Sequence, residues 1–455
     1  MLSALLTLSV LAAPATAAPH ASAKAPASGI VFLEDDYRGA LAKAKAAKKP
    51  LFLDGWATWC HSCLSMRSFV FPDAGLRAAK DAVIWLSVET EAEKNREVVE
   101  KFPADGLPTF LLIDPYTEQV IGRWLGTSSV NEMRHFVLDT TAAWQTARKG
   151  GKVSEAARAE QEGHAAQQRR DYAAAAAAYR RAVALSSGSD PLRPARINLL
   201  LGALGHQRTP EALRECLALA GSELPRAPAT PPGADLSLHA AECAAKAKDA
   251  PGAKELLAAA LKRIEALAGD RKGALSVDDR SDLYANLADQ LDELGRHDEA
   301  VAAMRKRSAM LEAAAAAAPD ATTAATFDAH RTDTYLYLGE PAKAEALLTA
   351  REKEMPTDYN PPARLARVLL EEKRAPEAEA AVNRALALMS QGPRKVGVLG
   401  LKARILQAQG KDKTPVLREQ LVLIETLPVT ERNPETKQKI EQELKALEAG
   451  PHAKL

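Results

Sequence analysis

The chain has 455 residues, too many for one ordinary hydrophobic core, which predicts two or three domains or one domain followed by a repeat array. Lys and Arg number 60 and Asp and Glu number 59, so the net charge is +1. This balance excludes the broad basic field that attracts nucleic acid or an anionic membrane surface. We therefore expect no nucleic acid among the partners.

The first 17 residues, "MLSALLTLSVLAAPATA", form a short apolar run that ends in small residues, with Ala15-Thr16-Ala17 in an A-x-A arrangement. This pattern is typical of an export signal, and it predicts a periplasmic or secreted protein. Residues 18–28 are rich in Ala, Pro and Ser and predict a flexible linker. The apolar run is shorter than the roughly 20 residues of a membrane span, so we expect no permanent membrane anchor.

Residues 29–147 alternate between two hydrophobic patterns. Apolar runs fit for strands occur at 51–57, 82–89, 106–114 and 119–126. Segments with helical spacing occur at 37–49, 61–71, 91–102 and 129–144. An alternation of this kind predicts an α/β sandwich.

Two cysteines follow the first of these strands in "DGWATWCHSCLSM", residues 54–66. Asp54 stands in the strand, Trp59 precedes the Cys60-x-x-Cys63 pair, and Leu107-Pro108-Thr109 precedes a later strand. These residues resemble the thioredoxin family, and the helix after Cys63 is especially similar to the C-terminal thioredoxin-like domain of periplasmic thiol:disulfide interchange proteins. The resemblance covers about a quarter of the chain and implies a thioredoxin fold with thiol-disulfide chemistry.

The position of the cysteines predicts their roles. At the start of a helix, free N–H groups and the helix dipole stabilise a thiolate, which makes Cys60 the expected nucleophile. Cys63, one turn further on and less exposed, is expected to resolve the mixed disulfide. Asp54 matches the buried carboxylate that accepts or delivers the proton of the resolving cysteine, and this role requires burial to raise its pKa.

The resemblance also implies a substrate-binding surface. Pro108 matches the cis-proline of the family, whose loop with Leu107 and Thr109 pairs with an extended substrate, and Trp59 would flank the site as an apolar contact. The dipeptide between the cysteines, His61-Ser62, is expected to tune the redox potential. A protonated His61 would favour the thiolate and make the disulfide more oxidising.

Each assignment has a simpler alternative. The cysteine pair could be a structural staple or half of a zinc site, although no second Cys or His pair stands nearby with ligand spacing, so we expect neither a metal nor a cofactor. Asp54 could be an ordinary strand-end residue, Pro108 a trans turn proline, and His61 could equally point into solvent.

Residues 155–447 are alanine-rich and helical in pattern, as in "DYAAAAAAYRRAVAL". Self-similar stretches place helix breakers at Gly295, Gly339, Lys373 and Gly410, which are 44, 34 and 37 residues apart. These segments resemble degenerate tetratricopeptide repeats, and we expect about six helix pairs. The expected fold is therefore an α/β thioredoxin fold followed by an all-α tetratricopeptide-like helical repeat solenoid.

Stacked helix pairs form a superhelix whose concave face can hold a peptide or a partner protein. The alternative is a scaffold with no specific ligand. Cys216 and Cys243 lie in successive helical segments of the array. They could be buried hydrophobes or, in an oxidising compartment, a disulfide.

Two hypotheses follow from the sequence. The first is an exported thiol-disulfide oxidoreductase that acts on protein disulfides or dithiols and recruits its partners through the repeats. If it works as a reductant, a separate membrane protein would have to supply its electrons. The second is a repeat-based adaptor whose thioredoxin-like domain is a binding module with little turnover. We further expect a separable boundary at the glycine-rich stretch 148–156.

Overall fold

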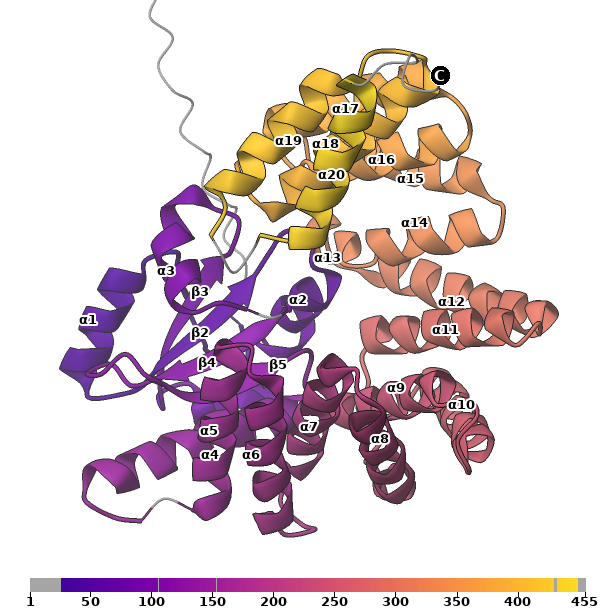
Figure 1. Ribbon diagram of the computed structural model, residues 1–455. Helices are drawn as coiled ribbons and strands as arrows, with labels where there is room; N and C mark the ends of the chain where they lie inside the picture. The colour runs from indigo at the N-terminus through magenta and orange to yellow at the C-terminus, as the bar shows by residue number, and fades with distance from the viewer. Residues whose placement is uncertain (1–25, 105, 153, 429–431, 449–455) are drawn as a thin grey trace, which may run out of the picture.

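The computed structural model describes residues 26–104, 106–152, 154–428 and 432–448 (Figure 1). The expected export signal at 1–17 and most of the expected linker at 18–28 lie outside the described residues. Within them, no helix combines the length and the apolar character that a membrane crossing requires.

The N-terminal domain is built on one mixed sheet with the strand order β1-β3-β2-β4-β5. The first three strands in this order are parallel, and β4 and β5 are antiparallel to their neighbours. The strands are β1 (Leu33–Glu34), β2 (Leu51–Trp56), β3 (Ile84–Glu89), β4 (Thr109–Ile113) and β5 (Val120–Leu125). The four strands expected from apolar runs are present, and the two-residue β1 is too short to give a sequence signal.

Helices cover both faces of this sheet. They are α1 (Tyr37–Ala47), α2 (His61–Ser65), α3 (Arg96–Lys101) and α4 (Val130–Arg148). Short 3₁₀ turns stand at Ala74–Ala79 and Glu93–Asn95. Strand side chains alternate between the two layers, so Phe52 and Phe110 pack on one face while Leu53 and Leu111 pack on the other.

The expected single helix over 61–71 is wrong in one respect. The α-helix ends at Ser65, and a π-helical turn continues from Met66 to Val70. The widened turn is closed by the Phe71 amide, which donates to the Met66 carbonyl. This turn carries Arg67 and Phe69, whose contacts with the rest of the molecule are described below.

The remainder of the chain is a succession of antiparallel helix pairs, and each pair packs on the next to give a continuous array. Its helices are α5 (Glu155–Gln168), α6 (Tyr172–Leu185), α7 (Arg193–Gln207), α8 (Pro210–Glu223), α9 (Pro231–Lys246), α10 (Ala253–Gly269), α11 (Val277–Glu293), α12 (His297–Ala317), α13 (Ala321–Ala325), α14 (Asp328–Tyr337), α15 (Pro341–Glu354), α16 (Asn360–Glu371), α17 (Ala375–Leu388), α18 (Pro393–Ala408), α19 (Thr414–Thr426) and α20 (Pro434–Glu448). We call this region, α5 to α20, the helical array.

Left-handed residues mark the turn inside each pair. The four breakers expected from the sequence all have positive φ, from 63° at Lys373 to 74° at Gly295. The other intra-pair turns use Arg170, Arg208 and Gly252 in the same conformation. The described residues therefore contain seven such pairs, with the short α13 between α12 and α14 and with α20 after the last pair, where about six pairs were expected.

Alanine lets the helices of the array approach closely, and its core is made of small residues such as Ala175, Ala240 and Ala378 among leucines. Cys216 of α8 and Cys243 of α9 form a disulfide between successive helices. The alternative of two separate buried thiols is thus excluded for this structure.

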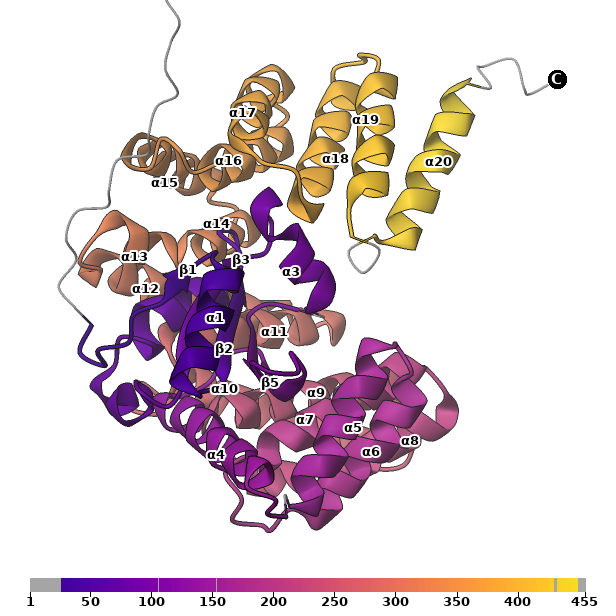
Figure 2. The ribbon, with the colours of Figure 1, turned by 90° about the vertical axis from the view of Figure 1, so that its left-hand side faces the viewer.

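The array curves around the N-terminal domain, so that the domain fills its concave side (Figures 1 and 2). Hydrogen bonds join the two parts along the arc, from Gln161 Nε2 to the Ile121 carbonyl at 3.1 Å to Tyr359 Oη on Glu91 at 3.0 Å. The expectation of a concave face open to a partner is wrong for this conformation, because the chain's own domain occupies it. The expected boundary at 148–156 spans the end of α4 at Arg148 and the start of α5 at Glu155, but contacts elsewhere hold the two parts together.

Limited proteolysis should therefore nick the loop at 148–154 without separating the two parts. We expect two fragments on a denaturing gel and a single species in gel filtration, since the contacts along the arc survive the cut. Elution of the two fragments as separate species would show that the array does not hold the domain in solution.

Candidate redox site

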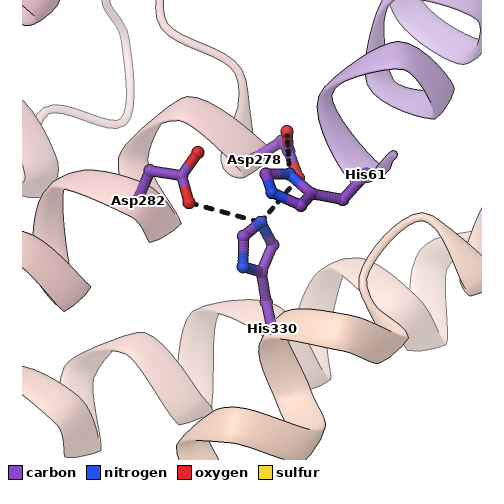
Figure 3. A group of neighbouring side chains, drawn as sticks. All are labelled: His61, Asp278, Asp282 and His330. Carbon is purple, nitrogen blue, oxygen red and sulfur yellow. Dashed lines mark hydrogen bonds and ion pairs between the residues drawn. The ribbon is translucent and has the colours of Figure 1, made fainter. Parts of the chain in front are cut away.

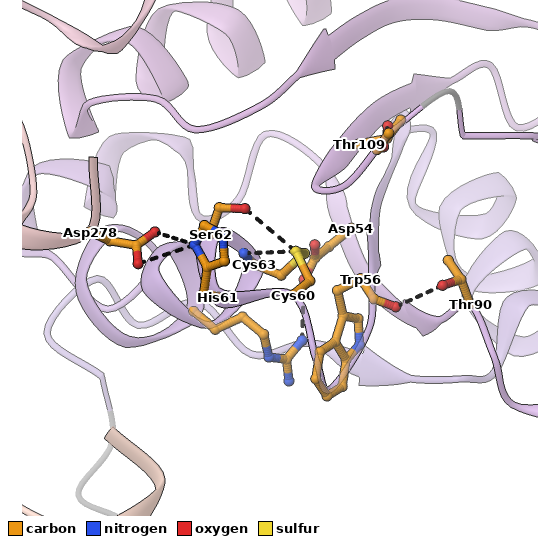
Figure 4. The surroundings of a disulfide bond; sticks show 11 residues. Asp54, Trp56, Cys60, His61, Ser62, Cys63, Thr90, Thr109 and Asp278 are labelled. Carbon is orange, nitrogen blue, oxygen red and sulfur yellow. Dashed lines mark hydrogen bonds and ion pairs between the residues drawn. A yellow bond between two sulfur atoms is a disulfide. The ribbon is translucent and has the colours of Figure 1, made fainter. Parts of the chain in front are cut away.

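The cysteine pair lies at the N-terminus of α2, directly after β2. Cys60 is the N-cap residue of α2, and its Sγ lies 3.1 Å from the backbone nitrogen of Cys63, whose N–H points at it. The two sulfurs form a disulfide (Figure 4). After reduction, the same N–H and the helix N-terminus would favour a thiolate at Cys60.

Both cysteines are buried, Cys60 at 3% exposure and Cys63 at 0%. Ala57 completes this small apolar cluster, against which Trp59 and Leu107 pack. The relative order of exposure agrees with the expected order of attack, in which the less exposed Cys63 resolves. Ser62 places its Oγ 3.5 Å from the Cys60 sulfur.

The peptide bond between Leu107 and Pro108 is cis, as the resemblance implied, so the alternative of a trans turn is excluded for this structure. Thr109 begins β4 and donates from its hydroxyl to the Gly106 carbonyl at 2.6 Å. A cavity of about 230 Å³ opens beside this loop, bordered by Trp59, Leu107 and, from the array, Pro393. Of the residues expected to bind substrate, Trp59, Leu107 and Thr109 line this cavity.

Asp54 is buried in the centre of β2 beside the disulfide, with 1% exposure (Figure 4). Burial raises its pKa to about 7, and the Arg67 guanidinium, 3.1 Å away, opposes part of that rise. A carboxyl group with this pKa can hold or release a proton at neutral pH. Burial and a raised pKa are the two properties that the expected proton-transfer role requires.

Arg67 is a residue of this site that the sequence analysis missed. The π-helical turn directs it toward Asp54, Ser87 and Glu34, and its guanidinium stacks on Trp56 at 4.2 Å. It is therefore the one positive charge among the described residues that forms a hydrogen bond with Asp54. A basic residue at the end of a short apolar helix gives no sequence signal for such a contact.

The His61 side chain points at the helical array and keeps 30% of its surface exposed. Its Nδ1 lies 3.1 Å from Oδ2 and 3.2 Å from Oδ1 of Asp278, the second residue of α11 in the helical array. Burial lowers the pKa of His61, but the hydrogen bond and charge of Asp278 outweigh it and raise the pKa to about 9. A pKa of this size favours the protonated imidazole at neutral pH.

Asp278, which is fully buried, also binds a second histidine. Its Oδ1 lies 2.9 Å from Nε2 of His330 on α14, and Asp282 lies 3.6 Å from the same nitrogen (Figure 3). Burial raises the pKa of Asp278, but the hydrogen bonds from His330 and His61 outweigh it and hold the pKa well below its usual value. No pairing of these residues was expected, because they lie 217 positions apart in the chain.

This cluster of His61, Asp278, Asp282 and His330 brings two imidazoles and two carboxylates within 4.8 Å of one another. Such donors suit a divalent cation. However, Arg307 donates to Nδ1 of His330 at 2.7 Å, which places the imidazole proton on Nε2, directed at Asp278. A metal-bound histidine would need the opposite arrangement, so the contacts describe an ion-pair network.

Further contacts close the array over the face that carries Cys60. Asn360 of α16 donates to the Thr58 hydroxyl at 3.3 Å, and the Arg394 guanidinium lies over Trp59 at 5.7 Å. Phe69 stacks on Phe327 with ring centroids 6.1 Å apart. The redox face is thus an interface between the two parts of the chain.

The comparisons with known proteins agree with this geometry. The family model described as thioredoxin-like matches residues 33–115. A thioredoxin H-type from Oryza sativa subsp. indica is 33% identical over 92 residues, which cover 20% of this chain and 70% of that protein. The chain belongs to the thioredoxin-like family.

The thiol:disulfide interchange protein DsbD of Pseudoalteromonas atlantica is 29% identical to the thioredoxin-like domain over 107 residues. The match covers 23% of this chain and 18% of that protein, so the chain spans less than a fifth of this relative. For the helical array, a tetratricopeptide repeat protein of Parabacteroides merdae aligns at 14% identity and a TM-score of 0.39, covering 64% of this chain and 98% of the other.

Proposed function

We propose that this protein is a thiol-disulfide oxidoreductase that exchanges disulfides with protein partners through Cys60 and Cys63. The observation that carries the proposal is the disulfide at the N-terminus of α2, where the Cys63 amide points at the Cys60 sulfur. A structural staple needs no such helix terminus and no ionisable carboxyl beside it, whereas a redox pair uses both.

In the reducing direction, the Cys60 thiolate attacks one sulfur of a partner disulfide and expels the other as a thiolate. Cys63 then loses its proton to Asp54 and attacks the Cys60 sulfur, which forms the Cys60–Cys63 disulfide and releases the partner's second thiolate. The two electrons thus pass from the cysteine pair to the partner. Oxidation of a partner dithiol is the same sequence in reverse.

Substrate binding is assigned to the cis-proline loop. Leu107, Pro108 and Thr109 would align an extended segment of the partner beside the disulfide, and Trp59 would supply apolar contact. The cavity of about 230 Å³ between Trp59 and Leu107 is large enough to receive one side chain of that segment.

We place this activity in the periplasm or outside the cell, because residues 1–17 have the sequence pattern of an export signal. A reductant in that compartment requires an external source of electrons, and a membrane protein with its own dithiol is the source that fits. Partner recruitment by the array would use its outer surface, because the thioredoxin-like domain fills its concave side (Figure 2).

The second candidate is an adaptor whose thioredoxin-like domain turns over little. The observation that favours it is the burial of Cys60 at 3% exposure beneath contacts from α16 and the start of α18. A protein partner cannot reach the sulfur in this conformation unless the array moves or the approaching segment is narrow.

A disulfide-reductase assay on the full chain separates the two candidates. With dithiothreitol as electron source and insulin as substrate, the wild-type protein should reduce insulin disulfides catalytically, and the Cys60→Ser variant should not exceed the uncatalysed rate. Equal rates of insulin reduction for the two proteins would contradict the oxidoreductase proposal and favour the adaptor.

A further inference from the structure

Asp278 is a buried carboxylate of the helical array that contacts a residue of the Cys60-x-x-Cys63 motif. It contacts His61, the residue next to Cys60, from 217 positions further along the chain. In Figure 4 it lies on the far side of His61 from the disulfide. The proposed exchange steps do not use it, so its role has to be sought in what it does to His61.

The surroundings of Asp278 fix it in place. Ser276 caps α11 by accepting from the Asp279 amide, which sets the first turn of the helix. His330 holds one carboxylate oxygen, and Arg307 holds His330 in turn while donating from Nε to the Ser281 hydroxyl at 2.9 Å. A carboxylate restrained in this way presents a fixed charge to His61.

The charged groups that face His61 come from three helices of the array. Asp278 and Asp282 lie on α11, Arg307 on α12 and His330 on α14. Burial and Arg307 both favour a neutral imidazole, whereas the two carboxylates favour the imidazolium. Asp278, which forms the hydrogen bonds, decides the balance, so the array keeps a positive charge beside Cys60.

A positive charge next to Cys60 stabilises its thiolate, and the thiolate exists only when the pair is reduced. Reduction breaks the S–S bond with two electrons, leaves Cys60 as a thiolate and gives Cys63 a proton. Whatever stabilises the thiolate therefore raises the reduction potential of the pair.

We propose that Asp278 is a positioning residue of the redox site, which holds the imidazolium of His61 beside Cys60 and thereby raises the reduction potential of the Cys60–Cys63 pair. The array is then part of the redox site as well as its cover. This proposal rests on the proposed function, because it concerns the same cysteine pair.

The test is the equilibrium of the full-length protein with reduced and oxidised glutathione at pH 7, in EDTA, with alkylation and mass measurement of the reduced fraction. The variant Asp278→Asn keeps the shape of the side chain and removes its charge. We expect the pair to become harder to reduce, with a change of about tenfold in the equilibrium constant, or about 30 mV.

Two further variants show whether the effect passes through His61. In a His61→Gln background, Asp278→Asn should change the equilibrium constant little, because the charge that it controls is already absent. Asp279→Asn is the matched control: Asp279 lies in the same turn of α11 and accepts from the Thr127 hydroxyl of the thioredoxin-like domain at 2.6 Å. It should leave the equilibrium constant unchanged.

An unchanged or raised potential in Asp278→Asn, or an equal shift in the His61→Gln background, overturns the proposal. If Asp278→Asn does not fold, the imidazole nitrogen signals of His61 in the wild-type NMR spectrum decide, since a neutral ring at pH 7 also overturns it. A wild-type pair that equilibrates with glutathione but never reduces insulin would instead contradict the proposed function and leave this inference standing.

Discussion

Replacing Cys63 by serine should trap the protein in mixed disulfides with its partners, whereas replacing Cys60 should not. Once Cys60 has attacked a partner, only Cys63 can break the new bond from inside the site, so its loss leaves the link intact. Cys60 has the position at the N-terminus of α2 that stabilises a thiolate, and Cys63 is fully buried one turn further on.

The measurement is non-reducing electrophoresis of each full-length variant after incubation with an oxidised protein substrate and an alkylating quench. Cys63→Ser should give substrate adducts that dithiothreitol reduces. The double variant Cys60→Ser, Cys63→Ser is the control, because any adduct that it forms must come from Cys216 or Cys243, which form the second disulfide. Equal trapping by the two single variants would show that the assignment of the nucleophile is wrong.

Replacing Asp54 by asparagine should slow the redox reaction and, at high pH, stabilise the thioredoxin-like domain. The carboxyl group has a pKa of about 7 in the folded protein against an ordinary value of 3.8, with burial as the main cause. Its ionisation is therefore disfavoured by folding. The contribution of the protonated carboxyl group to the free energy of unfolding is fully present below about pH 4. It is lost as the pH rises from there through 7.

At pH 9 the asparagine variant escapes this loss, which amounts to at most about 4 kcal/mol for a shift of this size. All five tryptophans lie between residues 56 and 144, so tryptophan fluorescence reports the unfolding of this domain alone. We expect a higher unfolding temperature than wild type at pH 9, a smaller gain at pH 5 and none below about pH 4. Because Cys63 loses its proton acceptor, insulin reduction should fall by roughly 100-fold at pH 7.

Glu34→Gln is the control for this prediction. Glu34 is a half-exposed carboxylate that also accepts from Arg67. Its replacement should alter neither the rate nor the dependence of stability on pH by a comparable amount. A wild-type rate in Asp54→Asn would assign the proton transfer to another group or to water.

Access to the redox face is the property that the helical array most clearly controls. The contacts of Asn360 with Thr58, Arg394 with Trp59 and Asp278 with His61 lie around Cys60 and come from three different helices. These contacts leave Cys60 with 3% exposure.

Local sequence patterns predicted the strands, the position of the cysteine pair and several turns of this protein. The alternating apolar runs predicted the four longer strands, because each strand buries side chains on both faces of one sheet. The spacing of Cys60 and Cys63 after a strand predicted a disulfide at a helix N-terminus. The helix breakers Gly295, Gly339 and Gly410 predicted turns, because glycine adopts positive φ without strain.

Contacts between distant segments were decided only by the tertiary structure. The pairing of Arg67 with Asp54 depends on a π-helical turn, and the disulfide between Cys216 and Cys243 depends on the packing of α8 on α9. The curvature that brings Asp278 to His61 is the sum of small rotations between successive helix pairs. The sequence of any one helix pair does not reveal this total curvature. The sequence analysis therefore predicted a concave face open to a partner, whereas in the folded chain the thioredoxin-like domain occupies that face.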